Sequence, residues 1–178
     1  MKTAFLITAR LKSTRLPKKI LLEVAGKPLI VHMLDRIKNA TSIDKIIICT
    51  STNHQDDPLE EIAGQEQVSR FRGSEEDVLV RLLEAAQSHG LKYFANTTAD
   101  CPMMDPLLID RAVLEYQKAN VDLLKYDDSH ADLPINCYLI KVSALEKVCQ
   151  QKKEADTEVW LRHFTSNPGL KVKSIYVK

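Results

Sequence analysis

The sequence has little of what would place it among membrane proteins or general binders of nucleic acid. No apolar run approaches the roughly 18 residues of a membrane span, and the formal net charge is only +1. The apolar start of the chain is short and is followed at once by Arg10 and Lys12, so we expect a strand there and not a signal peptide. We therefore expect no nucleic acid and no membrane among its partners.

The sequence also lacks cysteine pairs and metal-binding patterns. The four cysteines form no CxxC pair and lie mostly within apolar runs, which fits reduced thiols in a core and predicts a cytoplasmic protein. The five histidines show no spacing typical of metal ligands, so we expect structural roles for them. Neither a Walker A motif nor a GxGxxG turn occurs, which excludes the P-loop and dinucleotide-binding patterns.

What is present suits one ordinary folded domain. The chain has 178 residues, of which 44% are hydrophobic and 28% charged, close to the usual composition of globular proteins. A chain of this size buries roughly 70% of its unfolded surface, which is enough for one core, but it is too short for two full enzyme domains. We expect a single domain over residues 1–178.

Short apolar runs alternate with segments of helical period along the chain. The runs that predict strands lie at residues 3–9, 45–50, 92–97, 121–125 and 135–142. The helical patterns start at Pro28, at a cap on Ser74 and at Asp105, or span residues 143–151 and 156–164. This alternation predicts an α/β fold with three layers and a mostly parallel sheet. Ligands of such sheets bind beyond the carboxyl ends of the strands.

The loop after the first predicted strand is the most distinctive segment. Residues 9–19 hold five cations and no acid, and that charge density favours an anion such as a phosphate chain. Ser13 and Thr14 add small polar groups that can donate hydrogen bonds to phosphate oxygens. The alternative is a solvated basic loop, which spacing alone does not distinguish from a phosphate site.

The turn at residues 98–106 carries the second candidate. Asp100 follows a predicted strand end, where one carboxylate that faces a phosphate loop suits Mg²⁺. The alternative is that Asp100 only braces the turn. Asp105 is expected to cap the next helix, and Cys101 to be a structural thiol because no histidine lies nearby in sequence.

The segment at residues 71–77 is a weaker candidate. Gly73 permits a close approach of the backbone, and the helix N-terminus after Ser74 favours an anion or a polar ligand. Alone, this pattern is typical of a well-capped helix. Later in the chain, Trp160 and Phe164 stand at helical spacing, which predicts packing and not a ligand platform.

Taken together, these segments resemble a known family. The motifs that carry the resemblance are A-R-x-x-S-T-R-L-P-x-K at 9–19, A-G-K-P-L at 25–29, F-R-G-S-E-x-D-V-L at 71–79 and T-x-D-C-P-x-x-D-P at 98–106. In order and spacing they are similar to the signature of sugar cytidylyltransferases. The most similar branch is the spore coat polysaccharide biosynthesis type, which is related to the acylneuraminate and KDO cytidylyltransferases. The resemblance is good over residues 1–120 and thins afterwards.

The resemblance implies a Rossmann-like nucleotidyltransferase fold of the nucleotide-diphospho-sugar transferase type. It implies transfer of CMP from CTP to a sugar or sugar acid with release of pyrophosphate, Mg²⁺ as cofactor, and it leaves a homodimer open. By position, the catalytic residues would be Arg10, Lys19 and Asp100. The nucleotide-binding residues would be Ala9, Arg10, Ser13, Arg15, Lys19, Gly73, Ser74 and Asp77. The metal ligands would be Asp100 and Asn136. Such a displacement needs charge neutralisation and positioning more than a covalent nucleophile.

The chain departs from the family pattern at several positions. Lys18 stands where the family usually has glycine, Asn136 where an aspartate would help to bind metal, and Tyr138 where glutamate is usual. The C-terminal part is also shorter than in the relatives. Two alternatives therefore stay open beside a sugar cytidylyltransferase: a nucleotide-binding module of the same fold that is catalytically impaired, and a nucleotidyltransferase that acts on a polyol phosphate.

Overall fold

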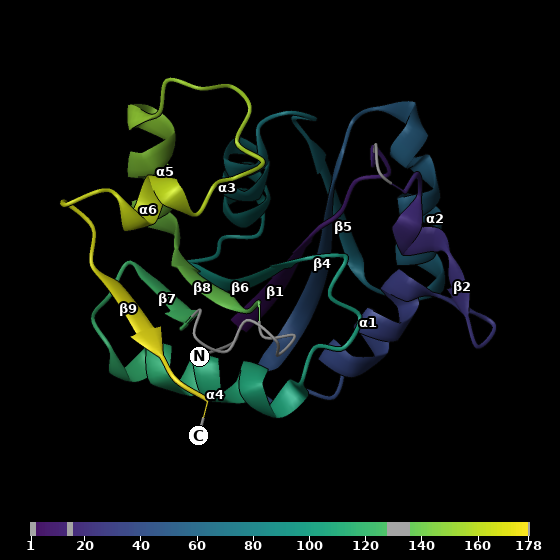
Figure 1. The fold of residues 1–178 in the computed structure, drawn as a ribbon, viewed down its shortest axis with the longest axis horizontal. Coiled ribbons are helices and arrows are strands. Elements are labelled where there is room, and N and C mark those ends of the chain that lie inside the picture. The colour runs from purple at the N-terminus through teal and green to yellow at the C-terminus, as the bar shows by residue number, and fades with distance from the viewer. Residues whose placement is uncertain (1–2, 14–15, 128–135, 178) are drawn as a thin grey trace.

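A seven-stranded sheet forms the centre of the protein in a computed structural model, which describes residues 3–13, 16–127 and 136–177 (Figure 1). The strands are β1 Thr3–Thr8, β4 Ile43–Ser51, β5 Ser69–Gly73, β6 Tyr93–Thr98, β7 Leu123–Tyr126, β8 Tyr138–Lys141 and β9 Val172–Ile175. Their order is β5-β4-β1-β6-β8-β7-β9. Only β8 runs antiparallel to its neighbours, β6 and β7. The predicted mostly parallel sheet is confirmed.

Helices cover both faces of this sheet. They are α1 Leu29–Ile37, α2 Asp57–Gln65, α3 Val78–Ser88, α4 Pro106–Lys118, α5 Val142–Gln151 and α6 Arg162–Thr165. Two short 3₁₀ turns, η1 Lys19–Leu21 and η2 His54–Asp56, lie in the loops after β1 and β4. Figure 1 shows α3, α5 and α6 on one side of the sheet and α1 and α4 on the other. The predicted three-layer α/β architecture is therefore confirmed.

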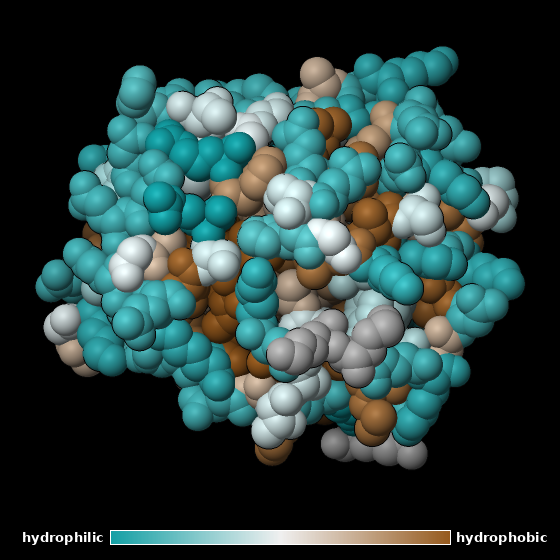
Figure 2. All heavy atoms as spheres, turned by 180° about the vertical axis from the view of Figure 1, so that it is seen from behind, coloured by the Kyte–Doolittle hydropathy of each residue, from teal (hydrophilic) through white to brown (hydrophobic). Residues whose placement is uncertain are grey.

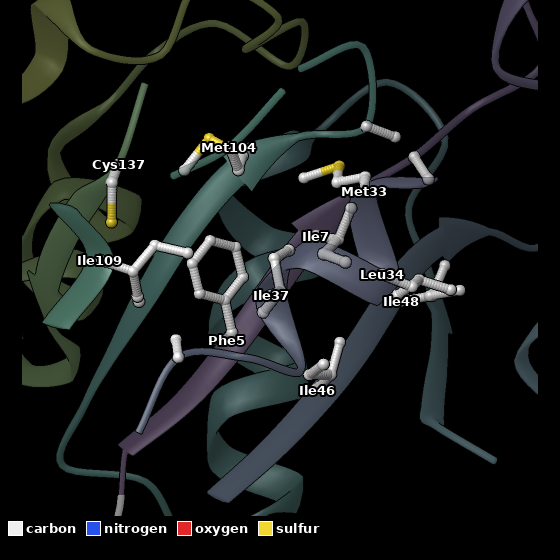
Figure 3. Packing of buried hydrophobic residues seen from close by; sticks show 14 of the residues in the cluster. Phe5, Ile7, Met33, Leu34, Ile37, Ile46, Ile48, Met104, Ile109 and Cys137 are labelled. Atoms are coloured by element: carbon white, nitrogen blue, oxygen red, sulfur yellow. The ribbon is translucent and has the colours of Figure 1, made fainter. Parts of the chain in front are cut away.

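Alternate residues of β1 supply two separate cores because side chains along a strand point to opposite faces. Phe5 and Ile7 pack with α1, α2 and α4, and Figure 3 shows them beside Met33 and Ile37 of α1. The alternate residues, such as Leu6, pack with α3 and α5 on the other face. A strand buried on both faces reads as a continuous apolar run, which is why the first strand was evident in the sequence.

The surface of the protein is mostly polar on the face that points away from the viewer in Figure 1. Figure 2 shows hydrophilic side chains over most of this face, with hydrophobic ones in small areas between them. Large exposed apolar residues such as Leu107 on α4 and Val159 occur on the surface as well. Within the described residues, no helix has the length and apolar character that a membrane span requires.

Several local expectations need correction. Ser74 is not the cap of α3: the helix begins at Val78, and the Asp77 carboxylate accepts the capping hydrogen bond from the Val80 N–H at 3.1 Å. Ser74 instead accepts from the Asp77 N–H at 3.0 Å, so it shapes the turn that leads to the cap. The helix expected over 156–164 is reduced to α6, because tertiary hydrogen bonds to Thr157 hold the earlier part in an irregular path.

Other elements lay outside the expectations altogether. The sequence patterns did not predict α2, β5 or β9, nor a small hairpin of β2 Glu23–Val24 and β3 Lys27–Pro28. The hairpin turns through Ala25 and Gly26, both of which have positive φ, as two-residue hairpin turns require. Pro28 precedes α1 as its N-cap residue and does not occupy its first turn. The strand expected over 135–142 begins in part outside the described residues, and β8 is its described portion.

Candidate functional site

The carboxyl ends of β1 and β6 open into a cavity of about 440 Å³. This is the position where ligands of open parallel sheets bind. The loop after β1 contributes Arg10, Lys12, Ser13 and Lys19 to its wall. The turn after β6 contributes Asp100, and the far wall consists of Glu76, Asp156, Glu158 and Trp160. The structure thus brings together cations and carboxylates that are up to about 150 residues apart in the sequence.

Lys19 and Asp100 contact each other directly in the wall of the cavity. The Lys19 Nζ donates to Asp100 Oδ2 at 2.7 Å, and Thr98 Oγ1 donates to Asp100 Oδ1 at 2.5 Å. Partial burial by itself would raise the pKa of the Asp100 carboxyl, but the hydrogen bonds from Lys19 and Thr98 outweigh it and hold the pKa below its ordinary value. Asp100 is therefore a carboxylate at neutral pH. The predicted proximity of the basic loop and the Asp100 turn is present in the structure.

Lys18 sets the direction from which Lys19 enters the cavity. Its backbone is left-handed, with φ 54° and ψ 27°, immediately before the η1 turn that begins at Lys19. Glycine adopts this conformation without steric cost, whereas a side chain such as that of lysine strains it. The left-handed backbone explains why a glycine is usual at this position in the family that the sequence resembles. This chain keeps the same conformation with the bulkier Lys18.

Carboxylates also lie close to two further cations of the loop, Arg10 and Lys12. Arg10 Nη1 donates to the Glu75 carbonyl oxygen at 2.6 Å and lies 3.8 Å from the Glu76 carboxylate. Arg10 Nη2 lies 3.5 Å from Glu158. The Lys12 Nζ donates to Glu76 at 2.7 Å, a hydrogen bond that raises the pKa of Lys12. Three cations of the basic loop, Arg10, Lys12 and Lys19, therefore line a cavity that also holds carboxylates.

The structure tests whether these residues suit a divalent cation. The described residues contain no group of three or more His, Cys, Asp or Glu side chains that could hold a metal ion by themselves. Mg²⁺ needs only one or two carboxylates when phosphate oxygens and water complete its shell. Asp100 alone therefore fits a metal that arrives with a phosphate chain, and it does not make a site for a free ion.

Asn136, the other predicted ligand, is exposed and does not line the cavity. Its Nδ2 lies 3.7 Å from the Sγ of Cys101, the residue that follows Asp100. It is thus adjacent to the Asp100 turn, but no contact with Asp100 brings it into a ligand position. Cys101 is a free thiol, like Cys49, Cys137 and Cys149.

The remaining predicted residues differ in where they lie. Ser13 lines the cavity, and Arg15 lies outside the described residues. Ala9 is buried, and its N–H donates to the Cys49 carbonyl at 3.1 Å, so it extends the pairing of β1 and β4. Gly73, Ser74 and Asp77 do not line the cavity: they build the turn and the start of α3 behind it.

Gly73 is needed for packing within the protein. A Cβ atom there would lie 2.9 Å from the Phe71 ring and 3.2 Å from the Arg81 Cγ. Atoms at such distances would force the neighbours to move. The sequence indicated that another group approaches the backbone closely at Gly73. In the structure, the side chains of Phe71 and Arg81 are the groups that do so, behind the wall of the cavity.

Sequence reasoning missed the buried Asp56, which holds the loop after β1. The Asp56 side chain is fully buried in η2, and its Oδ1 accepts from the Leu11 N–H at 2.8 Å. Its Oδ2 accepts from the Ser51 hydroxyl at 2.5 Å. A buried carboxylate that accepts several hydrogen bonds fixes its donors in place. The only signal in the sequence was an acid just after the second apolar run, and such residues are usually exposed.

Sequence reasoning also missed the segment 152–160, which forms the far wall. Thr157 is buried; its hydroxyl donates to Asp77 Oδ1 at 2.9 Å and accepts from the Leu79 N–H at 3.1 Å. Lys152 donates to the other oxygen of Asp77. These bonds attach the segment to the start of α3 and leave Trp160 in the wall of the cavity. The ring of Trp160 also packs edge-on against Phe164, as the spacing predicted.

Known proteins resemble this chain over most of its length. A family model described as cytidylyltransferase matches residues 4–167. An uncharacterised protein of Methanocaldococcus jannaschii is 31% identical over 154 residues, which are 86% of this chain and 63% of that protein. The 3-deoxy-manno-octulosonate cytidylyltransferase of Geobacter sulfurreducens is 31% identical over 64% of this chain and 44% of its own length. The spore coat polysaccharide biosynthesis protein SpsF of Bacillus subtilis is 34% identical over 60% of this chain and 46% of its own length.

Solved structures share the fold. A cytidylyltransferase from Leptospira borgpetersenii superposes with a TM-score of 0.88 at 27% identity, covering 100% of this chain and 77% of that one. A CMP:2-keto-3-deoxy-manno-octonic acid synthetase solved with CTP gives a TM-score of 0.79, with 99% of this chain and 90% of that one covered. Its identity of 17% shows the fold alone. The present chain spans 63% or less of the three curated relatives. The family model nevertheless matches residues 4–167, which is most of the chain, and the chain therefore belongs to the cytidylyltransferase family.

Proposed function

We propose that this chain binds CTP and transfers CMP to a hydroxyl of a sugar or sugar acid, with release of pyrophosphate. The observation that carries the proposal is the cavity beyond β1 and β6, which Arg10, Lys19 and Asp100 all line and in which Lys19 contacts the Asp100 carboxylate. The family of the chain supports the nucleotide. The names of its relatives support a sugar acceptor and a role in surface polysaccharide biosynthesis.

In this proposal each cavity residue has a defined part. Arg10 and Lys19 bind the triphosphate: both line the cavity, where the Arg10 Nη2 lies near the Glu158 carboxylate and the Lys19 Nζ pairs with Asp100. Ser13 and Arg15 support the loop. Bound Mg²⁺, held by Asp100 and phosphate oxygens, would neutralise charge that develops on the phosphates. Lys19 would exchange its partner from Asp100 to a phosphate oxygen, which frees the carboxylate.

The residues behind the cavity would act on the nucleotide indirectly. Gly73, Ser74 and Asp77 shape the turn that carries Glu75 and Glu76, and the Glu75 carbonyl fixes Arg10. A cytoplasmic location is part of the proposal, and the four free thiols support it. A homodimer remains a further proposal, to be checked by the molecular mass in solution.

One observation favours the alternative of a catalytically impaired module. Asp100 is the single carboxylate of the strand-end turn in the cavity wall, and Asn136 supplies no second charge there. Loss of one negative ligand weakens Mg²⁺ binding without removing the nucleotide pocket. In that case, Asn136→Asp would raise the rate of pyrophosphate release or lower the Mg²⁺ concentration that it requires.

Two measurements test the proposal separately. Isothermal titration calorimetry with CTP, ATP and GTP, each with and without Mg²⁺, tests nucleotide binding; we expect CTP to bind most tightly. Pyrophosphate release with CTP, Mg²⁺ and a panel of sugars, sugar acids and polyol phosphates tests turnover and identifies the acceptor. Binding without release for any acceptor would favour the impaired module. Absence of binding by any nucleotide at millimolar concentration would contradict the proposed function.

A further inference from the structure

Arg81 of α3 is fully buried and is the largest fully buried side chain among the residues that the structure describes. Its Nη1 donates to the carbonyl oxygens of Ser74 at 2.5 Å and of Glu75 at 3.2 Å. Its Nε and Nη2 have no hydrogen-bond partner among the described residues. A buried charge without full pairing is costly, whereas an apolar side chain of similar volume at such a position is often neutral or stabilising. The guanidinium is therefore poorly explained by stability alone.

The carbonyl of Glu75 links Arg81 to the cavity. The same oxygen accepts from Arg10 Nη1 at 2.6 Å, so two guanidinium groups donate to one carbonyl. A carbonyl oxygen has two lone pairs and can serve both donors. Arg10 lines the cavity, whereas Arg81 does not. Burial and then the neighbouring charge of Arg10 lower the pKa of Arg81, which agrees with their proximity.

Gly73 makes room for this arrangement. A side chain at residue 73 would bring a Cβ to 3.2 Å from the Arg81 Cγ, at the point where β5 leads into the turn. The turn at residues 74–76 then receives Arg81 from below and Arg10 from the cavity side. Among the described residues, the arginines are the hydrogen-bond donors given for the Ser74 and Glu75 carbonyls, whereas the third carbonyl of the turn, that of Glu76, accepts from the Thr157 N–H at 3.3 Å.

We propose that Arg81 is a positioning residue for the phosphate site: it fixes the Glu75 carbonyl, and this carbonyl fixes the Arg10 guanidinium toward the triphosphate. The inference rests on the proposed function, because it assumes a phosphate chain as the ligand of Arg10. Arg81 itself touches no ligand in this proposal. Its whole effect passes through Arg10, which distinguishes it from a residue that only stabilises the fold.

A double-mutant cycle tests the proposal. Affinities for Mg·CTP and for inorganic tripolyphosphate are measured by titration calorimetry on the full chain, for the wild type, Arg81→Met, Arg10→Ala and the double variant. We expect Arg81→Met to weaken both ligands about tenfold, the loss of one oriented charge-assisted hydrogen bond. In the Arg10→Ala background the same change should alter affinity less than about twofold. The melting temperature of Arg81→Met should stay level or rise.

Control variants separate positioning from folding. Arg81→Lys should recover part of the affinity, since an ammonium group can still donate to both carbonyls, and it carries the test if Arg81→Met does not fold. Arg36→Met is the matched control: the Arg36 side chain also donates to a backbone carbonyl, that of Met104 at 2.5 Å, but it does not line the cavity. It should leave affinity unchanged.

Three results would overturn the proposal: wild-type affinity in Arg81→Met, no recovery in Arg81→Lys, or an equal loss with and without Arg10. Tripolyphosphate separates this inference from the proposed function. If the wild type binds tripolyphosphate with the expected pattern but shows no preference for CTP, the function is wrong and the positioning role stands. If it binds neither ligand, both are wrong.

Discussion

The two sides of the cavity are built in different ways. On the Lys19–Asp100 side, two partly exposed side chains, 34% and 40% accessible, form one direct ion pair at 2.7 Å. On the Arg10 side, the arginine side chain is only 11% accessible. It bonds to the Glu75 carbonyl, and this turn rests on the buried Arg81. The difference teaches that the Lys19–Asp100 side can exchange partners with an incoming ligand, and it is called the exchangeable side below. The Arg10 side is held in a fixed geometry and is called the fixed side.

The largest effect is expected on the exchangeable side. Asp100→Ala should reduce pyrophosphate release by at least about 100-fold, because it removes the carboxylate that would hold the metal against the phosphates. The rate is measured against Mg²⁺ concentration for the wild type and the variant. Asp105→Ala is the control, because Asp105 caps α4 in the same turn. Its loss should lower the free energy of unfolding and leave the rate of pyrophosphate release unchanged. An unchanged rate in Asp100→Ala would place the metal site elsewhere.

The cations of the two sides come next. Arg10→Ala and Lys19→Ala should each weaken triphosphate binding by about 1.5–3 kcal/mol, the range for a charge-assisted hydrogen bond. Lys12→Ala should weaken it less, because the Lys12 side chain is half exposed and pairs with Glu76. Titration calorimetry measures all three, with Lys27→Ala as an exposed control that pairs with Asp35 away from the cavity. Equally small effects throughout would mean that the loop is a solvated surface.

The fixed side should be sensitive to a change that touches no cavity atom. Thr157→Val keeps the shape of a buried side chain but leaves the Leu79 N–H without its acceptor and removes one of the donors to Asp77. We expect a loss of about 1–2 kcal/mol in the free energy of unfolding, measured by urea denaturation. Thr165→Val removes an exposed hydroxyl on α6 and should change stability little. A neutral Thr157→Val would show that segment 152–160 does not need this anchor.

The smallest effect concerns the backbone that leads into the exchangeable side. Lys18→Gly should raise the free energy of unfolding by about 1 kcal/mol, because glycine relieves the strain of the left-handed conformation at φ 54°. Thermal melts measure the gain. Lys18→Ala removes the same charge and most of the side chain but keeps the strain, so it should not stabilise. If both variants behave alike, charge and not backbone conformation determines the effect.

The sequence predicted the exchangeable side well. Lys19 and Asp100 lie in the segments that follow β1 and β6, two buried strands that short runs of apolar residues made evident in the sequence. Once the strands are placed, the rule that ligands bind at their carboxyl ends brings the two residues together. The structure shows where these residues lie; the catalytic, nucleotide-binding and metal-binding roles of all the predicted site residues, and the single-domain boundary, stay predictions.

The fixed side could not be predicted in this way. Thr157 and Asp56 lie in short polar stretches with no period, and their partners are far away in sequence: Asp77 for the first and Leu11 for the second. Arg81 sits among apolar residues of α3, where helical spacing gives no reason to expect a buried charge. For the same reason, the helix predicted over 156–164 was largely wrong.

The sequence by itself determined the three-layer architecture and the segments that meet at the strand ends. These follow from local periodicity and short motifs, whose physical basis is contained within a few residues. Only the tertiary structure decided how Arg10 is held, and that residues of segment 152–160 line the cavity. Both depend on buried hydrogen bonds between residues about 60 to 80 positions apart. The energy of such a bond depends on burial and on the partner, and neither is specified by the residues next to it in the chain.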